Sequence, residues 1–416
     1  MTGSGLRLIA CAMALIGLLH TPAFADAPAD NPDMSFPDDW FAADADALAA
    51  TVLTPEQAAS QSDAVFDLVD RHIFDTASTA DARAKARKAA LAAVQNGPQT
   101  QETVGKAIDD ALQSIGYSHM FLFPPEIARE IVDMTKGKDD GKPAPSAISA
   151  RMIGDVGVLR VDSFMVPLFT QTALDEGFAK LAKAKVLLID VSGNGGGNSS
   201  SVVALAHPLV GAGKPIAKSV FRLGHAPTPF EQYGPLPDAD NHGGAADNAL
   251  GQVHGVVTWL TGKNAVAPAK RPIFVLIDGH CGSSCEIFSG AIKHYGAATL
   301  LGRNTAGKVL GGIAFRPPMK GYMLLLPTST VYGPGGEVYE GPGVAPDVEL
   351  QVCQTFAGKT SEEGRKSCLD AALAYITAHP RSAAAGGPAP RSPRQDTKNR
   401  QTESTERFGQ ASPSGG

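Results

Sequence analysis

The sequence predicts an α/β core preceded by a helical N-terminal domain, and three observations support this prediction. Between residues 151 and 350, short apolar runs alternate with segments of helical period, which is typical of an α/β layer. From about residue 45 to 132, apolar residues recur at i, i+3 and i+4, as in amphipathic helices. A stretch rich in Gly, Lys, Asp and Pro lies between the two parts. We therefore expect a helical domain over residues 26–135, a linker over 136–150 and a core over 151–350.

The expected elements follow from these periodicities in chain order. In the N-terminal domain the clearest helical patterns are residues 64–74 and 104–115. In the core the expected strands are residues 156–162, 186–191, 273–277, 298–301 and 323–327. The expected core helices are residues 171–183, 199–209 and 284–295. Residues 211–271 are rich in Gly, Pro and His, and we expect an insertion of loops that covers a substrate.

The two ends of the chain differ from the core in composition. Residues 1–25 carry Arg7, an apolar stretch and Ala23-Phe-Ala25, the features of a secretory signal peptide, so we expect export to the periplasm or the exterior. Most of the apolar stretch follows Cys11, which disfavours a lipoprotein cleavage box there. No later apolar run reaches the roughly 18 residues that span a bilayer. Residues 351–380 are expected to hold a last helix near 361–378, and residues 381–416 to be disordered.

Charge and cysteine content narrow the classes of partner. The formal net charge of −6 gives no reason to expect nucleic acid or an anionic membrane as a partner. Removal of the signal peptide leaves four cysteines, an even number that permits disulfides in an exported chain. We expect Cys353 and Cys368 to pair, because they bracket a polar loop. For Cys281 and Cys285 a disulfide and two buried thiols both remain open. Zinc is disfavoured because no His stands at finger spacing, and we expect no metal or cofactor.

Ser283 is the strongest candidate for a reactive side chain. It follows the apolar run 273–277 and precedes a helical pattern, so it lies at a helix N-terminus, where backbone N–H groups favour negative charge. The next expected strand delivers Lys308 on a second loop, and strands of one sheet can bring the two together. Ser283 could instead only cap its helix. A phosphate-binding P-loop around Lys308 is disfavoured, because Val309 stands where a Ser or Thr would hold Mg²⁺.

These residues resemble the signature of the C-terminal processing, or tail-specific, serine peptidases, with some features of the tricorn proteases. The segments that carry the resemblance are Ser283-Ser-Cys-Glu-Ile-Phe288, Tyr295-Gly296, Thr305-Ala-Gly-Lys308, Val186 to Gly197, Gly343 to Asp347 and Ile115 to His119. The resemblance implies a crotonase/Clp-protease-like core that hydrolyses peptide bonds of polypeptide substrates without a cofactor. It says nothing of the oligomeric state, the physiological substrate or the cleavage preference.

The resemblance also implies roles for individual residues. Ser283 would attack the peptide carbonyl to form an acyl-enzyme, and Lys308 would take its proton. The N–H groups of Ser284, Gly196 and Gly197 would form the oxyanion hole. A dinucleotide-binding interpretation of the glycine loop fails, because the pattern of glycines and acidic residues does not match.

Three alternatives to this assignment remain. The tricorn-type relatives use a Ser-His pair and a Glu at positions where this chain carries Ser118, His119 and Glu340, so a Ser-His-Glu relay is the alternative to the Ser/Lys dyad. We favour Lys308 as the base, because its separation from Ser283 in the sequence is that of the lysine-type members. A non-catalytic peptide-binding relative and an esterase are the other functional alternatives. The processing peptidases usually carry a PDZ domain before the core, and the stretch from Glu126 to Arg151 is too short for one, which leaves tail specificity open.

Overall fold

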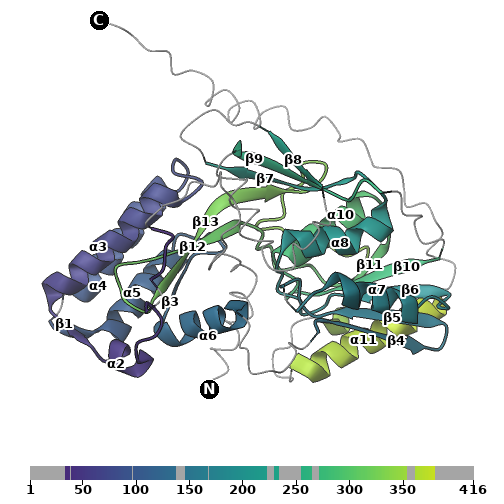
Figure 1. The fold of residues 1–416 in the computed structure, drawn as a ribbon, viewed down its shortest axis with the longest axis horizontal. Helices are drawn as coiled ribbons and strands as arrows, with labels where there is room; N and C mark the ends of the chain where they lie inside the picture. Colours follow the sequence, from purple (N-terminus) through teal and green to yellow (C-terminus); the bar gives the residue numbers. More distant parts are fainter. Residues whose placement is uncertain are drawn as a thin grey trace, which may run out of the picture.

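The computed structural model describes residues 33–37, 39–95, 97–136, 146–166, 168–222, 229–233, 254–264, 271–353 and 361–379. The expected signal peptide (1–25) and tail (381–416) lie outside the described residues, as does most of the expected linker. The described chain forms a helical N-terminal part and two large β-sheets. The N-terminal helices lie on one side of the long strand β13, and the first sheet with its covering helices lies on the other side (Figure 1).

The N-terminal part consists mainly of helices. Their bounds are α2 Ala45–Ala49, α3 Pro55–His72, α4 Ala80–Val94, α5 Gln101–Gln113 and α6 Pro125–Lys136. Short strands β1 (Val52–Leu53) and β2 (Gln99–Thr100) pair with each other. Helix α3 begins at a capping box, in which Thr54 and Gln57 satisfy each other's backbone N–H groups. Its apolar face, including Val65 and Phe66, is buried against α4, α5 and the second sheet. The helices therefore share one core with strands that lie much later in the chain.

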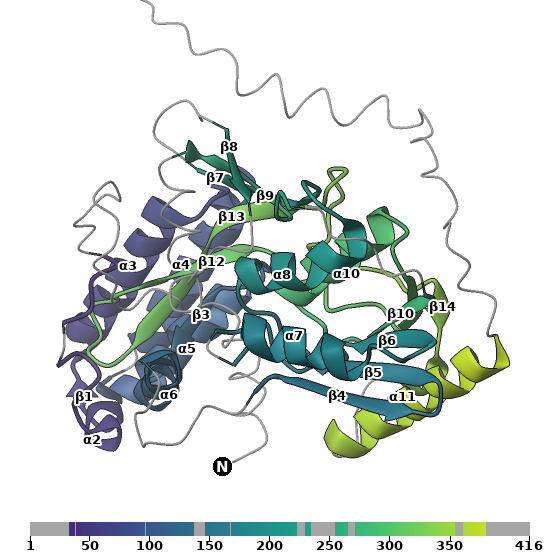
Figure 2. The ribbon, with the colours of Figure 1, turned by 45° about the vertical axis from the view of Figure 1, so that its right-hand side comes forward.

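The first sheet is the α/β layer that the sequence predicts. Its strands, in spatial order, are β14 (Val348–Glu349), β11 (Thr299–Gly302), β10 (Ile273–Ile277), β6 (Val186–Asp190), β5 (Val156–Val161) and β4 (Ile148–Ile153). All neighbours are parallel except β4 and β5. Every residue of β10 is buried, as the apolar run Ile273–Ile277 requires. Three helices cover one face: α7 (Gln171–Lys180), α8 (Ser199–Val210) and α10 (Ser284–His294). Helix α11 (Ser361–Ala378) covers the other (Figure 2).

The second sheet is not expected as a separate sheet from the sequence, although the predicted strand 323–327 lies in its strand β13. It is ordered β12 (Gly311–Phe315), β13 (Met323–Tyr332), β7 (Pro215–Phe221), β9 (Val256–Leu260) and β8 (Phe230–Tyr233), with β3 (Phe121–Phe123) also paired to β13. Strands β7, β8 and β9 come from residues 211–271, where we expected loops. That expectation is wrong for the described part of the segment, because β7 pairs with the long strand β13, β9 pairs with β7, and β8 pairs with β9.

The predicted α/β core with a helical N-terminal region is thus confirmed. Helix α11 occupies the residues predicted for the last helix, and η2 (Gln351–Cys353), a short 3₁₀ turn, is joined to it by the Cys353–Cys368 disulfide. Helix α6 ends at Lys136 and β4 begins at Ile148, so the chain between them is too short for an inserted PDZ domain. Across the described ranges, every helix is either too short or too polar to cross a membrane.

Candidate active site

The candidate site lies at one edge of the first sheet. Because β6, β10 and β11 are parallel, the loops that follow them emerge together at their carboxyl ends. Hydrogen bonds join these loops directly. The N–H of Gly282 donates to the carbonyl of Asn194 (3.1 Å), and the N–H of Ala306 donates to that of Cys281 (2.9 Å). The glycine loop, the nucleophile turn and the Lys308 loop therefore form one structural unit, as the sequence predicts.

Ser283 occupies a strained backbone conformation at the start of α10. Its φ of 54° lies in the left-handed region, where a non-glycine residue costs about 1–3 kcal/mol and needs strong support from its surroundings. Within the described residues, the only other non-glycine residue in that region is His119. The N–H of Ser283 donates to the carbonyl oxygen of Lys308 (2.8 Å), and the side chain is partly exposed. Both strained residues are thus candidates that the sequence singled out.

Glu286 links the nucleophile turn to the Lys308 loop, and the sequence analysis did not identify this role. Its carboxylate is fully buried on α10. Oε2 accepts the N–H groups of Ser283 (3.2 Å) and Lys308 (2.7 Å). Oε1 accepts the N–H of Gly307 (2.7 Å) and the hydroxyl of Thr305. Burial raises the pKa of Glu286, while these hydrogen bonds work in the opposite direction. One carboxylate therefore holds two loops of the site.

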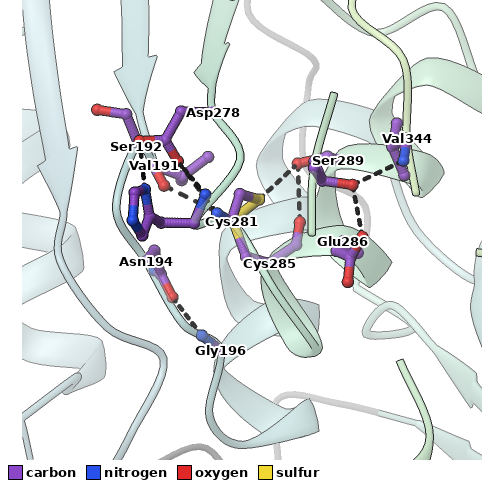
Figure 3. Close-up of a disulfide and its surroundings, with 12 residues drawn as sticks. Val191, Ser192, Asn194, Gly196, Asp278, Cys281, Cys285, Glu286, Ser289 and Val344 are labelled. Atoms are coloured by element: carbon purple, nitrogen blue, oxygen red, sulfur yellow. Dashed lines mark hydrogen bonds and ion pairs between the residues drawn. A yellow bond between two sulfur atoms is a disulfide. The ribbon is translucent and has the colours of Figure 1, made fainter. Parts of the chain in front are cut away.

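The glycine loop lies against the nucleophile. A Cβ on Gly196 would be 2.8 Å from Cβ of Ser283 and 3.0 Å from the nitrogen of Ser284, and its φ of +112° also excludes a side chain. The N–H of Gly196 donates to Oδ1 of Asn194 (2.8 Å; Figure 3). The hydroxyl of Ser284 donates to the carbonyl of Gly197 (2.7 Å), which fastens the loop to α10. Of the three expected oxyanion donors, Gly196 is therefore already engaged, whereas Ser284 and Gly197 have no N–H acceptor among the described residues.

His119 belongs to a continuous hydrogen-bonded chain. Its Nδ1 lies 2.8 Å from Oγ of Ser118, and that hydroxyl donates to Oε2 of Glu340 (2.9 Å). Because the hydroxyl proton goes to the carboxylate, Ser118 accepts from His119, and Nδ1 carries the imidazole proton. This tautomer leaves Nε2 as the acceptor. Burial, and secondly the positive charge of Lys308, lower the pKa of His119 to about 3, so the ring is neutral at ordinary pH.

Lys308 lies in the same cluster but differs from the expected environment of a lysine base. Its main chain contacts both Ser283 and Glu286, and its charge acts on His119. The N–H of the next residue, Val309, donates to Oε2 of Glu340 (2.6 Å). A neutral lysine requires burial among apolar groups, whereas this side chain is exposed. The structure thus brings all four predicted catalytic residues into one network and leaves Lys308 at its surface.

Both cysteine pairs are disulfides. Cys281 and Cys285 are joined across the nucleophile turn, and Cys353 and Cys368 are joined beneath the other face of the sheet. Within the described ranges, no group of three His, Cys, Asp or Glu side chains is arranged to hold a metal ion.

Together, the α/β sheet and the strand-to-helix turn that carries Ser283 are typical of α/β hydrolytic enzymes with a serine nucleophile. Residues 155–350 match the model of peptidase family S41, and this segment is identified as a member of that serine peptidase family. The match covers the parallel strands, the glycine loop, the turn of Ser283 and the Lys308 loop, in agreement with the expected crotonase/Clp-protease-like core.

Known proteins similar to the chain include a carboxy-terminal-processing protease of Bartonella bacilliformis, which is 24% identical over 49% of this chain and 41% of the relative. The chain thus spans about two fifths of the length of that relative. Among solved structures, a lipoprotein from Streptococcus agalactiae matches 77% of this chain and 96% of its own, with 14% identity and a TM-score of 0.49. The photosystem II D1 C-terminal processing protease matches 73% and 98%, with 14% identity and a TM-score of 0.45.

Proposed function

We propose that this chain is an exported serine endopeptidase in which Ser283 is the nucleophile. The observation that carries the proposal is the left-handed turn of Ser283 at the start of α10, with the glycine loop against it and the Lys308 loop bonded to its N–H. Such a turn presents a hydroxyl beside backbone N–H groups, the arrangement that acyl transfer requires. Family membership supports peptide bonds as the substrate class.

His119 is the base that the geometry supports best. The Ser118–Glu340 chain orients its ring and leaves Nε2 ready to accept a proton, and the low pKa keeps it neutral. In the proposed reaction Nε2 takes the proton of Ser283 as Oγ attacks the carbonyl carbon. The imidazolium then returns this proton to the leaving amine, and water releases the acyl-enzyme by the same route. Lys308, which the sequence favours, is the second candidate base, since its loop contacts Ser283.

The oxyanion of the tetrahedral intermediate would lie between the glycine loop and the start of α10. The N–H groups of Ser284 and Gly197 are the available donors, whereas that of Gly196 is engaged by Asn194. The N-terminal end of α10 adds the positive end of its dipole. Each such donor is worth about 2.7–4 kcal/mol of transition-state stabilisation.

The proposal is tested by hydrolysis of fluorescein-labelled casein. Ser283→Ala should abolish turnover, whereas Ser200→Ala, at the first turn of α8, should leave it unchanged. Hydrolysis of p-nitrophenyl acetate in parallel distinguishes an esterase from a peptidase. A chain that binds but never cleaves casein, with Ser283→Ala equal to wild type, would instead be a peptide-binding relative.

The base is assigned by comparing His119→Ala with Lys308→Ala. If His119 is the base, its loss should reduce kcat by orders of magnitude, while Lys308→Ala keeps most activity. The pH profile supplies a second criterion, because a base whose pKa is about 3 gives no acid limb near neutrality. A lysine base would instead give activity that rises with pH toward the range in which lysines deprotonate, about 10. An inactive Lys308→Ala beside an active His119→Ala would restore the Ser/Lys dyad.

Export is part of the proposal and is supported by the two disulfides, since these bonds form and persist in oxidising compartments. The signal-peptide residues themselves lie outside the described residues. Cell fractionation of the full chain, followed by N-terminal sequencing of the mature protein, tests it. A protein that stays in the reducing cytoplasm with Met1 or Thr2 at its N-terminus would refute export.

A further inference from the structure

The nucleophile lies inside a disulfide ring. Cys281 and Cys285 are bonded to each other with their Cα atoms 5.3 Å apart (Figure 3). Ser283 is the central one of the three residues between them in the sequence. Both cysteines are completely buried, beneath the partly exposed Ser283. The ring therefore spans the turn that carries the strained backbone of Ser283.

Hydrogen bonds fasten the ring to its surroundings on several sides. Before Ser283, the N–H of Cys281 donates to the carboxylate of Asp278 (3.1 Å), and that of Gly282 donates to the Asn194 carbonyl. After it, the N–H of Cys285 donates back to the carbonyl of Gly282 (3.0 Å). The first two bonds fix the arm before Ser283 to the end of β10 and to the glycine loop, and the Ser284 hydroxyl bond to Gly197 fixes the arm after it to the same loop. Ser283 lies between the two arms at a positive φ, a backbone conformation that persists only if its surroundings hold it in place.

We propose that the Cys281–Cys285 disulfide is a positioning element of the active site, which holds Ser283 in its reactive conformation and makes activity depend on the oxidised state. This inference rests on the proposed function, because it assigns the nucleophile to Ser283. Relaxation of the backbone at Ser283 would separate its hydroxyl from the N–H groups of Ser284 and Gly197. Substrate contacts away from the turn would remain.

The dependence on oxidation follows from ordinary thiol chemistry. Dithiothreitol supplies two electrons and two protons, converts the S–S bond to two thiols and closes to its own cyclic disulfide. Opening of the ring removes the covalent constraint between the two arms and leaves the hydrogen bonds alone to maintain the turn. Cys353–Cys368 lies in the hydrophobic cluster on the opposite face of the sheet, separate from the cluster that holds Cys281 and Cys285.

The second disulfide provides a matched control. The test variant is Cys281→Ser with Cys285→Ser, and the control is Cys353→Ser with Cys368→Ser. Serine suits the test positions, because Oγ of Ser289 lies 3.7 Å from one sulfur and the Val191 carbonyl oxygen 3.6 Å from the other, so that both hydroxyls find partners. Each variant is measured for kcat and KM on casein and for its rate of labelling by a fluorophosphonate.

The expected result is a fall of kcat and labelling rate by about 100-fold in the test variant, with KM unchanged, and no change of either in the control. Should the test variant fail to fold, the control variant is reduced with dithiothreitol, since it retains only the ring disulfide in the mature chain. Its activity should fall as thiols appear at Cys281 and Cys285 by mass spectrometry, and return on reoxidation.

Wild-type kcat in a folded test variant, or full activity in the reduced control, would overturn this inference and leave the proposed function intact. A wild-type enzyme that neither cleaves casein nor takes up the label would overturn the proposed function, and the inference with it.

Discussion

Replacement of Glu286 by glutamine removes the carboxylate that connects the nucleophile turn to the Lys308 loop. In the native protein each oxygen of Glu286 accepts two hydrogen bonds: Oε2 from two backbone N–H groups, and Oε1 from one N–H and one hydroxyl. Glutamine offers one oxygen and one NH₂ group. Whichever way the amide is oriented, its NH₂ faces two donors, and two buried hydrogen bonds are lost.

The magnitude follows from the number of donors left without an acceptor. A buried donor without an acceptor costs about 1–3 kcal/mol. With the NH₂ group in place of Oε2, the N–H of Ser283 keeps the Lys308 carbonyl as its acceptor and only the N–H of Lys308 loses its own, so we expect a loss of about 1–3 kcal/mol in the free energy of unfolding. The lower part of this range is expected, because the raised pKa of Glu286 indicates that burial of its charge is itself unfavourable. The loosened turn should also lower kcat.

Urea unfolding followed by the fluorescence of Trp40 and Trp259 measures this loss. Glu176→Gln is the matched control, since Glu176 is exposed on α7 and its replacement should change stability by less than about 0.5 kcal/mol. If Glu286→Gln unfolds at the same urea concentration as Glu176→Gln and retains full activity, the carboxylate does not connect the two loops in the way described.

Three further predictions concern other parts of the structure. Burial lowers the pKa of His119 to about 3, so the neutral ring contributes fully to stability above the unfolded pKa of about 6.5, and this contribution is lost as pH falls toward 3. Between pH 7 and pH 4, the free energy of unfolding measured in urea should therefore fall less in His119→Gln than in wild type. An equal fall in the two proteins would contradict this prediction. Gly197→Ala should abolish casein hydrolysis, because the new Cβ would collide with the main chain of Phe164. The control Gly211→Ala, also at positive φ but in open space, should remain active. Equal activity of the two variants would exclude the collision. Cys353→Ser with Cys368→Ser should lower the free energy of unfolding by about 3 kcal/mol in urea titrations without loss of turnover, and an unchanged midpoint would show that the clamp is dispensable.

Much of the first sheet could be predicted from the sequence, because its strands are short apolar runs separated by helices of clear period. Strand β10 and helix α11 lie at the predicted residues. In the second sheet only β13 could be predicted, as the strand 323–327. The other strands could not, because β12 contains two glycines and β7 to β9 lie in a segment dominated by turn-forming residues. β12 and β7 are strands because they pair with β13, and β9 and β8 continue the sheet from β7; these are tertiary interactions that local composition does not reveal.

The candidate site shows the same division. Ser283, His119 and Glu340 could be identified because their local motifs are distinctive. The contacts that decide their roles could not be predicted, because they join residues that only the fold brings together. Asn194 accepts the N–H of Gly196, Glu286 accepts four hydrogen bonds, and the Cys281–Cys285 disulfide spans the turn of Ser283. The exposure of Lys308 is likewise a property of the folded loop.

The central claim is that Ser283 is the nucleophile, and covalent labelling tests it most directly. Wild-type protein and Ser283→Ala are incubated with a fluorophosphonate, digested and mapped by mass spectrometry. The account predicts a single adduct in wild type, on Ser283, and none in Ser283→Ala. An adduct on a different serine, or undiminished casein hydrolysis by Ser283→Ala, would contradict it.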